Sequence, residues 1–240
     1  MIDLHCHILA GLDDGPADLD ASLAMARAHA DAGVRRVVAT PHVTCSMPND
    51  APGIALAVAE LELALAAEAI PLRVSRGAEI GLARAVELDD PALDALALAG
   101  GPWKLVEAPL RAGEDTAADF RRLQRRGHRL LIAHPERSPA FQGDPAVLTG
   151  LVAAGALVQV TAGALVGRFG APVQRVARDF VHRGLVHVVA SDAHDTTRRA
   201  PGLRAEIDAA GFGDRAEWLT RDVPAALVGE RQLPAGLRAA

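Results

Sequence analysis

Short apolar runs rich in β-branched residues alternate along this chain with longer stretches in which apolar residues recur every three or four positions. Seven runs of the first kind are predicted to be strands: residues 1–5, 34–40, 72–80, 103–108, 129–134, 156–162 and 186–191. The predicted helices include residues 19–32, 53–69, 115–126, 172–183 and 201–210. Strands that alternate with helices of this length form βα units, so the sequence predicts an α/β protein with a parallel sheet.

A polar residue stands at or just past the end of each predicted strand. These residues are His5, His7, Thr40, His42, Glu79, Glu107, His134, Thr161, Asp192 and His194. The glycine-rich phosphate loops typical of open doubly wound sheets, GxGxxG and GxxxxGK[ST], do not occur. A barrel brings the carboxyl ends of its strands to one central point, whereas an open sheet spreads them along a line. The distribution therefore favours a barrel with a single active site.

The spacing of the first two histidines indicates a metal site. Residues i and i+2 of a strand face the same side, so His5 and His7 project together while Cys6 faces the covering helices. Asp192 and His194 repeat this spacing. Converging imidazoles and carboxylates are the nitrogen and oxygen donors that a divalent cation binds.

Two buried carboxylates strengthen the metal interpretation. Glu79 and Glu107 each follow an apolar run, where an unpaired buried carboxylate would cost several kcal/mol. A single histidine at a strand end is more often a hydrogen-bonded packing residue, but here six of the seven strand ends carry a histidine or an acid. Asp13 and Asp14 lie in the turn "GLDDGP", where either one could instead form an Asx-turn or cap a helix.

Two arginines follow histidines of this set closely: Arg137 lies three residues after His134, and Arg199 lies five after His194. A planar guanidinium binds phosphate oxygens in a fork, and a cationic metal cluster also favours phosphate. Arginine is common here, since Lys104 is the only lysine among 25 basic residues, so this spacing alone is weak evidence.

Length and charge narrow the class of protein. The 240 residues suit one domain over 1–240, with a short C-terminal tail from about residue 221. A net charge of -5 gives no long-range attraction for nucleic acid or acidic membranes. No apolar run reaches the roughly 18 residues of a membrane span, no leader pattern is present, and two cysteines make no disulfide framework. We therefore expect a cytoplasmic protein with no nucleic-acid partner and no membrane insertion.

Several motifs resemble those of a known family. They are, in order, "MIDLHCHILAGLDDGP", "VVATPH", "RGAEI", "LVEAPL", "LIAHPER", "QVTAGALVGRFG" and "HVVASDAHDTTRRAP". Over nearly the whole chain they resemble the polymerase and histidinol phosphatase (PHP) superfamily. Within it, they are most similar to the CpsB/CapC/YwqE group, the manganese-dependent protein-tyrosine phosphatases of bacterial capsule and exopolysaccharide operons.

The resemblance implies a distorted seven-stranded, TIM-like (βα)7 barrel and a site for three divalent metal ions, expected to be manganese, with iron or zinc as alternatives. By motif position, one ion is held by His5, His7, Glu79 and Asp192, a second by Glu79, Glu107 and His134, and a third by Asp14, His42 and His194. Arg137 and Arg199 match the phosphate-binding arginines, and Arg111 is a further candidate substrate ligand.

The implied reaction is phosphoester hydrolysis by metal-activated water, with Arg137, Arg199 and Asp192 as catalytic residues. Asp192 is one candidate proton acceptor, and Asp13 or His42 is a candidate acid. The expected substrate is a phosphorylated protein, such as the tail of a bacterial tyrosine kinase, or a small phosphoester. A homo-oligomer is also compatible with the family.

Three alternatives stay open from the sequence. One is a PHP phosphatase or phosphodiesterase that acts on a small metabolite of the histidinol phosphate or nucleotide type. Another is an amidohydrolase, which is disfavoured because Lys104 lies at the start of its strand, away from the expected site. The third is a metal-binding scaffold without catalysis. The loops "VTCSMPNDAPG" after His42 and "APLRAGED" after Glu107 depart from the family pattern, which leaves the substrate less certain than the metal chemistry.

Overall fold

The computed structural model describes all residues except 112–114, 233, 235–236 and 238–240. The described strands are all parallel and form two sheets. The three-stranded sheet has the order β1 (Ile2–Cys6), β2 (Arg36–Ala39), β4 (Arg73–Arg76). The six-stranded sheet has the order β3 (His42–Val43), β5 (Glu79–Gly81), β6 (Trp103–Glu107), β7 (Arg129–Ala133), β8 (Leu157–Thr161), β9 (Val188–Ala190). The predicted α/β class with a parallel sheet is confirmed.

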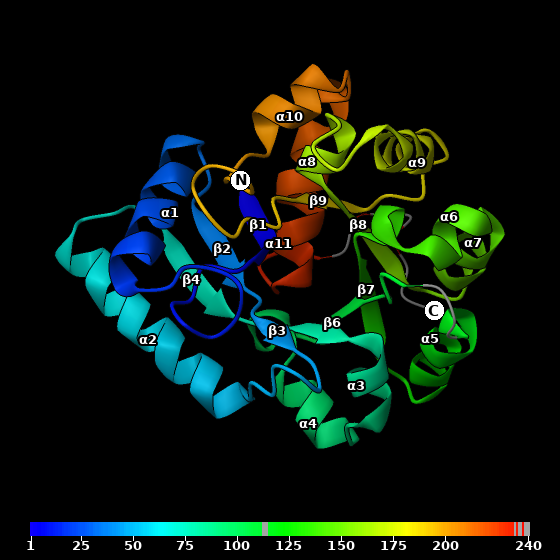
Figure 1. Cartoon of the computed structure of the whole chain (residues 1–240), viewed down its shortest axis with the longest axis horizontal. Coiled ribbons are helices and arrows are strands. Elements are labelled where there is room, and N and C mark those ends of the chain that lie inside the picture. Colours follow the sequence, from blue (N-terminus) through cyan, green and yellow to red (C-terminus); the bar gives the residue numbers. More distant parts are fainter. Residues whose placement is uncertain (112–114, 233, 235–236, 238–240) are drawn as a thin grey trace.

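Most helices lie around the outside of the strands, whereas α11 (Val223–Leu227) lies behind the centre of the view in Figure 1. Those between β1 and β6 are α1 (Leu19–Asp31), α2 (Ala51–Ala67), α3 (Leu82–Glu87) and α4 (Asp90–Ala95). The rest are α5 (Thr116–Arg125), α6 (Pro139–Gly143), α7 (Pro145–Ala153), α8 (Ala162–Leu165), α9 (Ala171–His182), α10 (Arg204–Ala209) and α11 (Val223–Leu227). Their first turns are often fixed by an aspartate: Asp18, Asp50 and Asp115 each accept a hydrogen bond from a backbone N–H of α1, α2 and α5.

The run 72–80, predicted as one strand, is divided into β4 and β5. The division falls at Gly77 and Ala78, where β4 has paired with β2 and β5 goes on to pair with β3. A Cβ atom at Gly77 would lie 2.7 Å from Val38 Cγ1, so the chain passes too close to β2 for any side chain here. Pro41 lies between β2 and the additional short strand β3. Because proline has no N–H, it cannot donate a hydrogen bond to a neighbouring strand at this position.

The two sheets meet at two places. On one side, β2 leads into β3 and the Glu79 N–H donates to Pro41 O (3.2 Å). On the other side, β1 lies beside the segment that follows β9, where the Asp192 N–H donates to His5 O and the His7 N–H to Ala193 O, both at 2.9 Å. Within the described residues these contacts do not form a continuous ladder that closes one sheet, so barrel closure stays a prediction.

Two apolar clusters fill the molecule. The larger lies between strands and helices and includes Phe120, Phe141 and Phe180. The second is built from strand residues such as Leu105 and Leu131 and is covered by α11, and its members are Ile2, Leu4, Val38, Leu98, Trp103, Leu105, Leu131, Ala133, Leu157, Val188, Ala190, Val223, Ala225, Leu227 and Val228. Trp103 and Leu105 of β6 belong to this second cluster, and the next residue on the same face of the strand is Glu107, at its carboxyl end. The apolar filling therefore gives way to polar side chains at that end. Among the described residues, no helix is both long and apolar enough to span a bilayer.

Candidate metal centre

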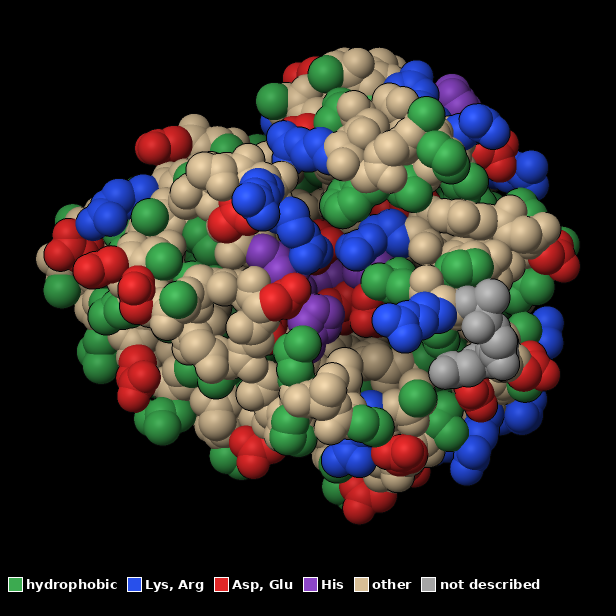
Figure 2. Space-filling model, in the orientation of Figure 1, with side chains coloured by type: hydrophobic (Ala, Val, Ile, Leu, Met, Phe, Trp, Pro, Cys, Tyr) green, Lys and Arg blue, Asp and Glu red, His purple; other side chains and the backbone are tan. Residues whose placement is uncertain are grey.

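Histidine and acidic side chains gather in a hollow at the carboxyl ends of the strands, with arginines beside them (Figure 2). All nine predicted metal ligands fall into four overlapping groups whose donor atoms lie within 4.8 Å of one another. The groups are His7, Asp14, His42 and His194; His5, His134 and Asp192; His5, His7 and Glu79; and His42, Glu79 and Glu107. The structure thus brings together side chains from both ends of the chain.

The first histidine pair converges with two carboxylates. The Nε2 atoms of His5 and His7 lie 3.2 Å apart. Each lies 3.3 Å from Glu79 Oε2, and they lie 3.4 and 3.5 Å from Asp192 Oδ1. Neighbouring donors around one ion with bonds of about 2.0–2.3 Å are spaced by roughly 3–3.7 Å, so these four atoms fit a shared divalent cation.

A change of strand face near His5 makes this convergence possible. Leu4 packs in the second apolar cluster, which α11 covers, and Cys6 packs in the larger cluster between strands and helices. Simple alternation along β1 would place both side chains on one face. The register of β1 against β2 shifts between Asp3 and Cys6, which turns His5 and His7 inward. Cys6 Sγ then contacts His29 Nε2 of α1 at 3.2 Å, so the predicted outward position of Cys6 is observed.

Glu79 also links the histidine pair to a second group. Its Oε1 atom lies 2.7 Å from His134 Nε2, and Glu107 Oε1 lies 3.8 Å from the same nitrogen. The other oxygen, Oε2, lies 3.0 Å from His42 Nδ1. One carboxylate therefore faces donors on both sides, as a bridging ligand between two ions must.

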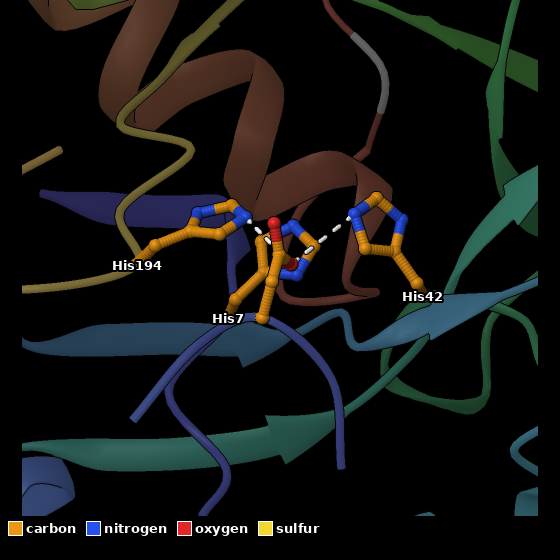
Figure 3. Close-up of side chains that lie close together, drawn as sticks. His7, His42 and His194 are labelled. Atoms are coloured by element: carbon orange, nitrogen blue, oxygen red, sulfur yellow. Dashed lines mark ion pairs between the residues drawn. The ribbon is translucent and has the colours of Figure 1, made fainter. Parts of the chain in front are cut away.

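A third group lies at the more open side of the hollow. His7, His42 and His194 point toward one another, and ion pairs join the outer two to a carboxylate between them (Figure 3). This carboxylate is Asp14, whose Oδ1 lies 3.5 Å from His42 Nε2 and 3.2 Å from His194 Nε2. The rings of His7 and His194 are in close contact, tilted by 31° with centroids 3.8 Å apart.

Several buried donor atoms of the cluster have other ligands of the cluster as near neighbours but make no hydrogen bond of good geometry with the described residues. They are His42 Nδ1, Glu79 Oε2, Asp192 Oδ1 and His194 Nε2. Buried polar atoms are normally paired, because desolvation without a partner is costly. Four such atoms in one cluster of His, Asp and Glu are accounted for by divalent cations, so the donor set fits the predicted metals.

The charges of the cluster perturb its ionisation. Burial would raise the pKa of Glu79, but the adjacent His5 and His134 outweigh this effect and hold it well below its usual value. Burial and the negative charge of Glu79 together raise the pKa of Glu107 to about 7. Two carboxylates this close repel each other, and cations bound in the hollow would offset this repulsion.

Arg137 and Arg199 converge on one oxygen of Asp192. Their Nη atoms donate to Asp192 Oδ2 at 3.0 and 2.6 Å, on the opposite side of this carboxylate from the histidine pair. The guanidinium of Arg137 also lies 4.9 Å from the ring centroid of Phe169. Both arginines therefore border the hollow, as predicted. Arg111 is exposed on the loop after β6, and in the described part of the chain no ion pair joins it to the cluster.

Two residues that hold the histidine pair in place were not predicted for this role. Gln159 Oε1 accepts a hydrogen bond from His5 Nδ1 (2.9 Å), and Asp13 Oδ2 lies 2.6 Å from His7 Nδ1. Both imidazoles are thereby oriented with Nε2 toward the cluster. The same oxygen of Asp13 also accepts a hydrogen bond from the His42 N–H. In this structure Asp13 therefore positions the two histidines, whereas the sequence suggested it as a candidate acid. The sequence does carry a sign of the role of Gln159, because this residue is polar inside an otherwise apolar strand.

Backbone strain is concentrated beside the site. His134 and Asp192 adopt positive φ values of 28° and 53°, although neither is glycine. Such conformations cost about 1–3 kcal/mol and persist where the surroundings enforce them, often at functional sites. Here His134 directly follows β7 and Asp192 lies two residues after β9, and both side chains face the hollow.

The sequence and the fold are similar to those of known proteins. Residues 1–211 match the family model described as "Capsular polysaccharide synthesis, CpsB/CapC". The tyrosine-protein phosphatase YwqE of Bacillus subtilis is 38% identical over 204 residues, which is 83% of this chain and 79% of the relative. The tyrosine-protein phosphatase CpsB of Streptococcus pneumoniae is 28% identical over 221 residues, 87% of this chain and 88% of the relative.

A solved structure extends the match to the whole fold. It comes from a study of YwqE from Bacillus subtilis and CpsB from Streptococcus pneumoniae, described as unique metal-dependent tyrosine phosphatases. It superimposes with a TM-score of 0.84 at 32% identity and covers 97% of this chain and 96% of the other. The family suggested by the sequence motifs is confirmed, and the chain belongs to the CpsB/CapC family of capsular polysaccharide synthesis proteins.

Proposed function

We propose that this protein is a metal-dependent protein-tyrosine phosphatase linked to capsule or exopolysaccharide regulation. The observation that carries the proposal is the convergence of nine histidine and carboxylate ligands with two arginines in one hollow. The relatives named as tyrosine-protein phosphatases support the reaction class. We further propose that the two sheets form one distorted barrel, in a single domain over residues 1–240, because both of their meeting places are hydrogen-bonded.

Three divalent ions account for the donor set in this proposal. His5, His7, Glu79 and Asp192 hold the first; Glu79, Glu107 and His134 the second; and Asp14, His42 and His194 the third. Bound there, the ions supply Lewis acidity, which lowers the pKa of water and offsets negative charge on a phosphoryl group. The mixed nitrogen and oxygen donors suit manganese, iron or zinc.

The residues of the chain position the phosphoryl group. Arg137 and Arg199 present Nη atoms beside Asp192, from where they bind the non-bridging phosphoryl oxygens and stabilise the charge that grows on them. Asp192 holds both guanidiniums in place through one oxygen while its other oxygen faces His5 and His7. The same carboxylate therefore fixes the distance between the anion-binding arginines and the metal ligands, and it is also the proposed proton acceptor.

A comparison of substrates tests the reaction. The metal-loaded protein is expected to hydrolyse a phosphotyrosine peptide faster than histidinol phosphate or a dinucleotide. Exclusive turnover of either of the latter two would refute the tyrosine-phosphatase proposal and favour the small-metabolite alternative.

Two variants test the site. His5→Ala and Arg137→Ala are each expected to abolish phosphatase activity, but for different reasons. Elemental analysis should show that the histidine variant loses at least one metal ion while the arginine variant keeps all of them. Turnover like that of the unmodified protein in both variants would show that the site lies elsewhere.

A further inference from the structure

A pocket of about 200 Å³ adjoins the metal centre on the side of Glu107. Glu107 is its link to the cluster, because this carboxylate belongs to the group formed with His42 and Glu79. The other lining residues are Thr44, Cys45, Gly81, Leu82, Ala83, Arg84, Ala108 and Pro109. Apart from Glu107 and Arg84 the lining is uncharged, so this pocket differs in chemistry from the hollow that it opens from.

A second pocket, of about 230 Å³, lies beside the first. The two share Arg84, which projects from α3. The second pocket is lined by Val43 and Pro48, which pair with each other across a turn, by the start of α2 and the residues before it (Asn49, Asp50, Ala51 and Pro52), and by Leu88, Ala92, Ala95 and Leu96. Apart from Arg84, Asp50 and Asn49, this lining is apolar. Together the pockets form a groove between the turn at residues 43–48 and helices α3 and α4. We call it the α3 groove.

The charges and exposure of the α3 groove suit a polypeptide. Arg84 is the only basic residue that lines it among the described residues, and its side chain is 35% exposed and paired only with the exposed Glu87 at 3.2 Å. A guanidinium in this state is free to donate to a peptide carbonyl without loss of a buried ion pair. The apolar walls on either side of it accept apolar or small side chains.

We propose that the α3 groove binds the extended peptide segment that flanks the phosphotyrosine of a protein substrate. The inference rests on the proposed phosphatase function and adds where the rest of the substrate lies. With the phosphoryl group between the metal ligands and the arginines, the chain on one side of the tyrosine passes Glu107 and runs along α3 past Arg84 toward Ala95. A small phosphorylated metabolite would fill the hollow and leave this groove empty.

The same residues explain why the recognition is particular to this chain. The segment "VTCSMPNDAPG", which departs from the family pattern, supplies Thr44 and Cys45 to the first pocket and Pro48 to the second. The motifs that carry the family resemblance supply the metal ligands and the arginines, whereas this segment supplies part of the wall of the α3 groove. The peptide preference is therefore set by the groove, and the chemistry by the hollow.

Two substitutions that fill the α3 groove test the proposal. Ala83→Trp blocks the first pocket and Ala95→Trp blocks the second; both alanines are exposed, so the fold is expected to tolerate the larger side chain. Ala66→Trp, on the exposed face of α2 and outside both pockets, is the matched control. The metal-loaded proteins are compared on a twelve-residue phosphotyrosine peptide with apolar flanking residues and on free phosphotyrosine.

The expected result is a change in selectivity. The unmodified protein should prefer the peptide, and each groove variant should lower the ratio of the two kcat/KM values by about tenfold, mainly through KM, which is the scale on which one buried apolar side chain changes affinity. The control should keep the ratio. Equal use of the two substrates by the unmodified protein, or an unchanged ratio in both groove variants, would overturn the groove while leaving the phosphatase proposal standing. Failure to hydrolyse either substrate would overturn the phosphatase proposal itself.

Discussion

The tautomers of the first histidine pair are set by residues that lie behind them. Gln159 accepts from His5 Nδ1, and Asp13 contacts His7 Nδ1, so each Nε2 is left as the donor atom for a metal. One partner is neutral and the other is anionic, which makes His7 the more basic of the two ligands. Gln159 Nε2 has no partner among the described residues, so only its oxygen contributes to this arrangement.

Removing that oxygen should weaken metal binding. Gln159→Leu is expected to lower metal affinity by about 10–100-fold, because His5 loses the acceptor that fixes its ring. Gln159→Glu keeps an acceptor at this position and should restore most of the affinity. Calorimetric titration of the metal-free proteins measures both values. Equal affinities for the leucine variant and the unmodified protein would show that His5 is oriented by the backbone alone.

A buried carboxyl next to the site makes stability depend on pH. Burial raises the pKa of Glu136 to about 7, above its ordinary value of 4.5, and only Oε1 is paired, with the Thr161 N–H. The folded protein therefore holds a proton that the unfolded chain releases. The free energy of unfolding should fall as pH rises from about 4.5 through 7, by an amount on the order of 3 kcal/mol.

Glu136→Gln removes this titration and should flatten the profile over the same pH range. Chemical denaturation of both proteins at pH 5, 6, 7 and 8 gives the comparison. If the two profiles run parallel, Glu136 has an ordinary pKa in the folded protein and the burial argument is wrong.

At the scale of elements, the passage from β4 to β5 depends on a close approach of the backbone at Gly77 to two buried side chains. A Cβ at Gly77 would lie 2.7 Å from Val38 Cγ1 and 3.0 Å from Leu98 Cδ2, both of them fully buried. Gly77→Ala is therefore expected to destabilise the protein by about 1–3 kcal/mol through overpacking.

The matched control is Gly150→Ala in α7, where a Cβ meets nothing within 4 Å. This change should stabilise the protein by about 0.5–1 kcal/mol, because alanine loses less conformational entropy in a helix. Thermal unfolding of the two variants gives the sign directly. Stabilisation by both changes would mean that the strand junction has room to relax.

The elements themselves were largely predictable. Runs such as 103–108 and 129–134 became β6 and β7 within one residue, because apolar strands between turn residues carry a strong local signal. The division of 72–80 was not predictable, because it results from contact with Val38, which is distant in sequence. Polar strand ends predicted the ligands by the same local logic, whereas Gln159 and the α3 groove depend on tertiary packing that no local pattern encodes.

For the whole molecule, metal removal should reduce both activity and stability. The hollow holds several buried carboxylates, and burial together with repulsion from Glu79 raises the pKa of Glu107, so cations should stabilise the folded state over the unfolded chain. A free metal ion at 100 times the dissociation constant of its site adds about 2.7 kcal/mol to the free energy of unfolding. The unfolding temperature should therefore fall on chelation and recover when manganese or zinc is added.

Arg137→Ala is a suitable control for this measurement, because it keeps all nine donors. Its unfolding temperature should respond to metal as that of the unmodified protein does, although its activity is lost. If elemental analysis shows that the metal has been lost and the unfolding temperature is the same before and after chelation, metal binding does not stabilise the folded protein.

The close contact between the rings of His7 and His194 has a consequence for biosynthesis. These rings touch although 187 residues separate them in the chain, and their shared group also needs Asp14 and His42. While the ribosome is still translating the middle of the message, the amino-terminal ligands have no partners from the last strand. A polypeptide that ends before His194 cannot assemble the complete group, so the full centre forms only after synthesis has passed His194 and the two ligand-bearing segments have folded together.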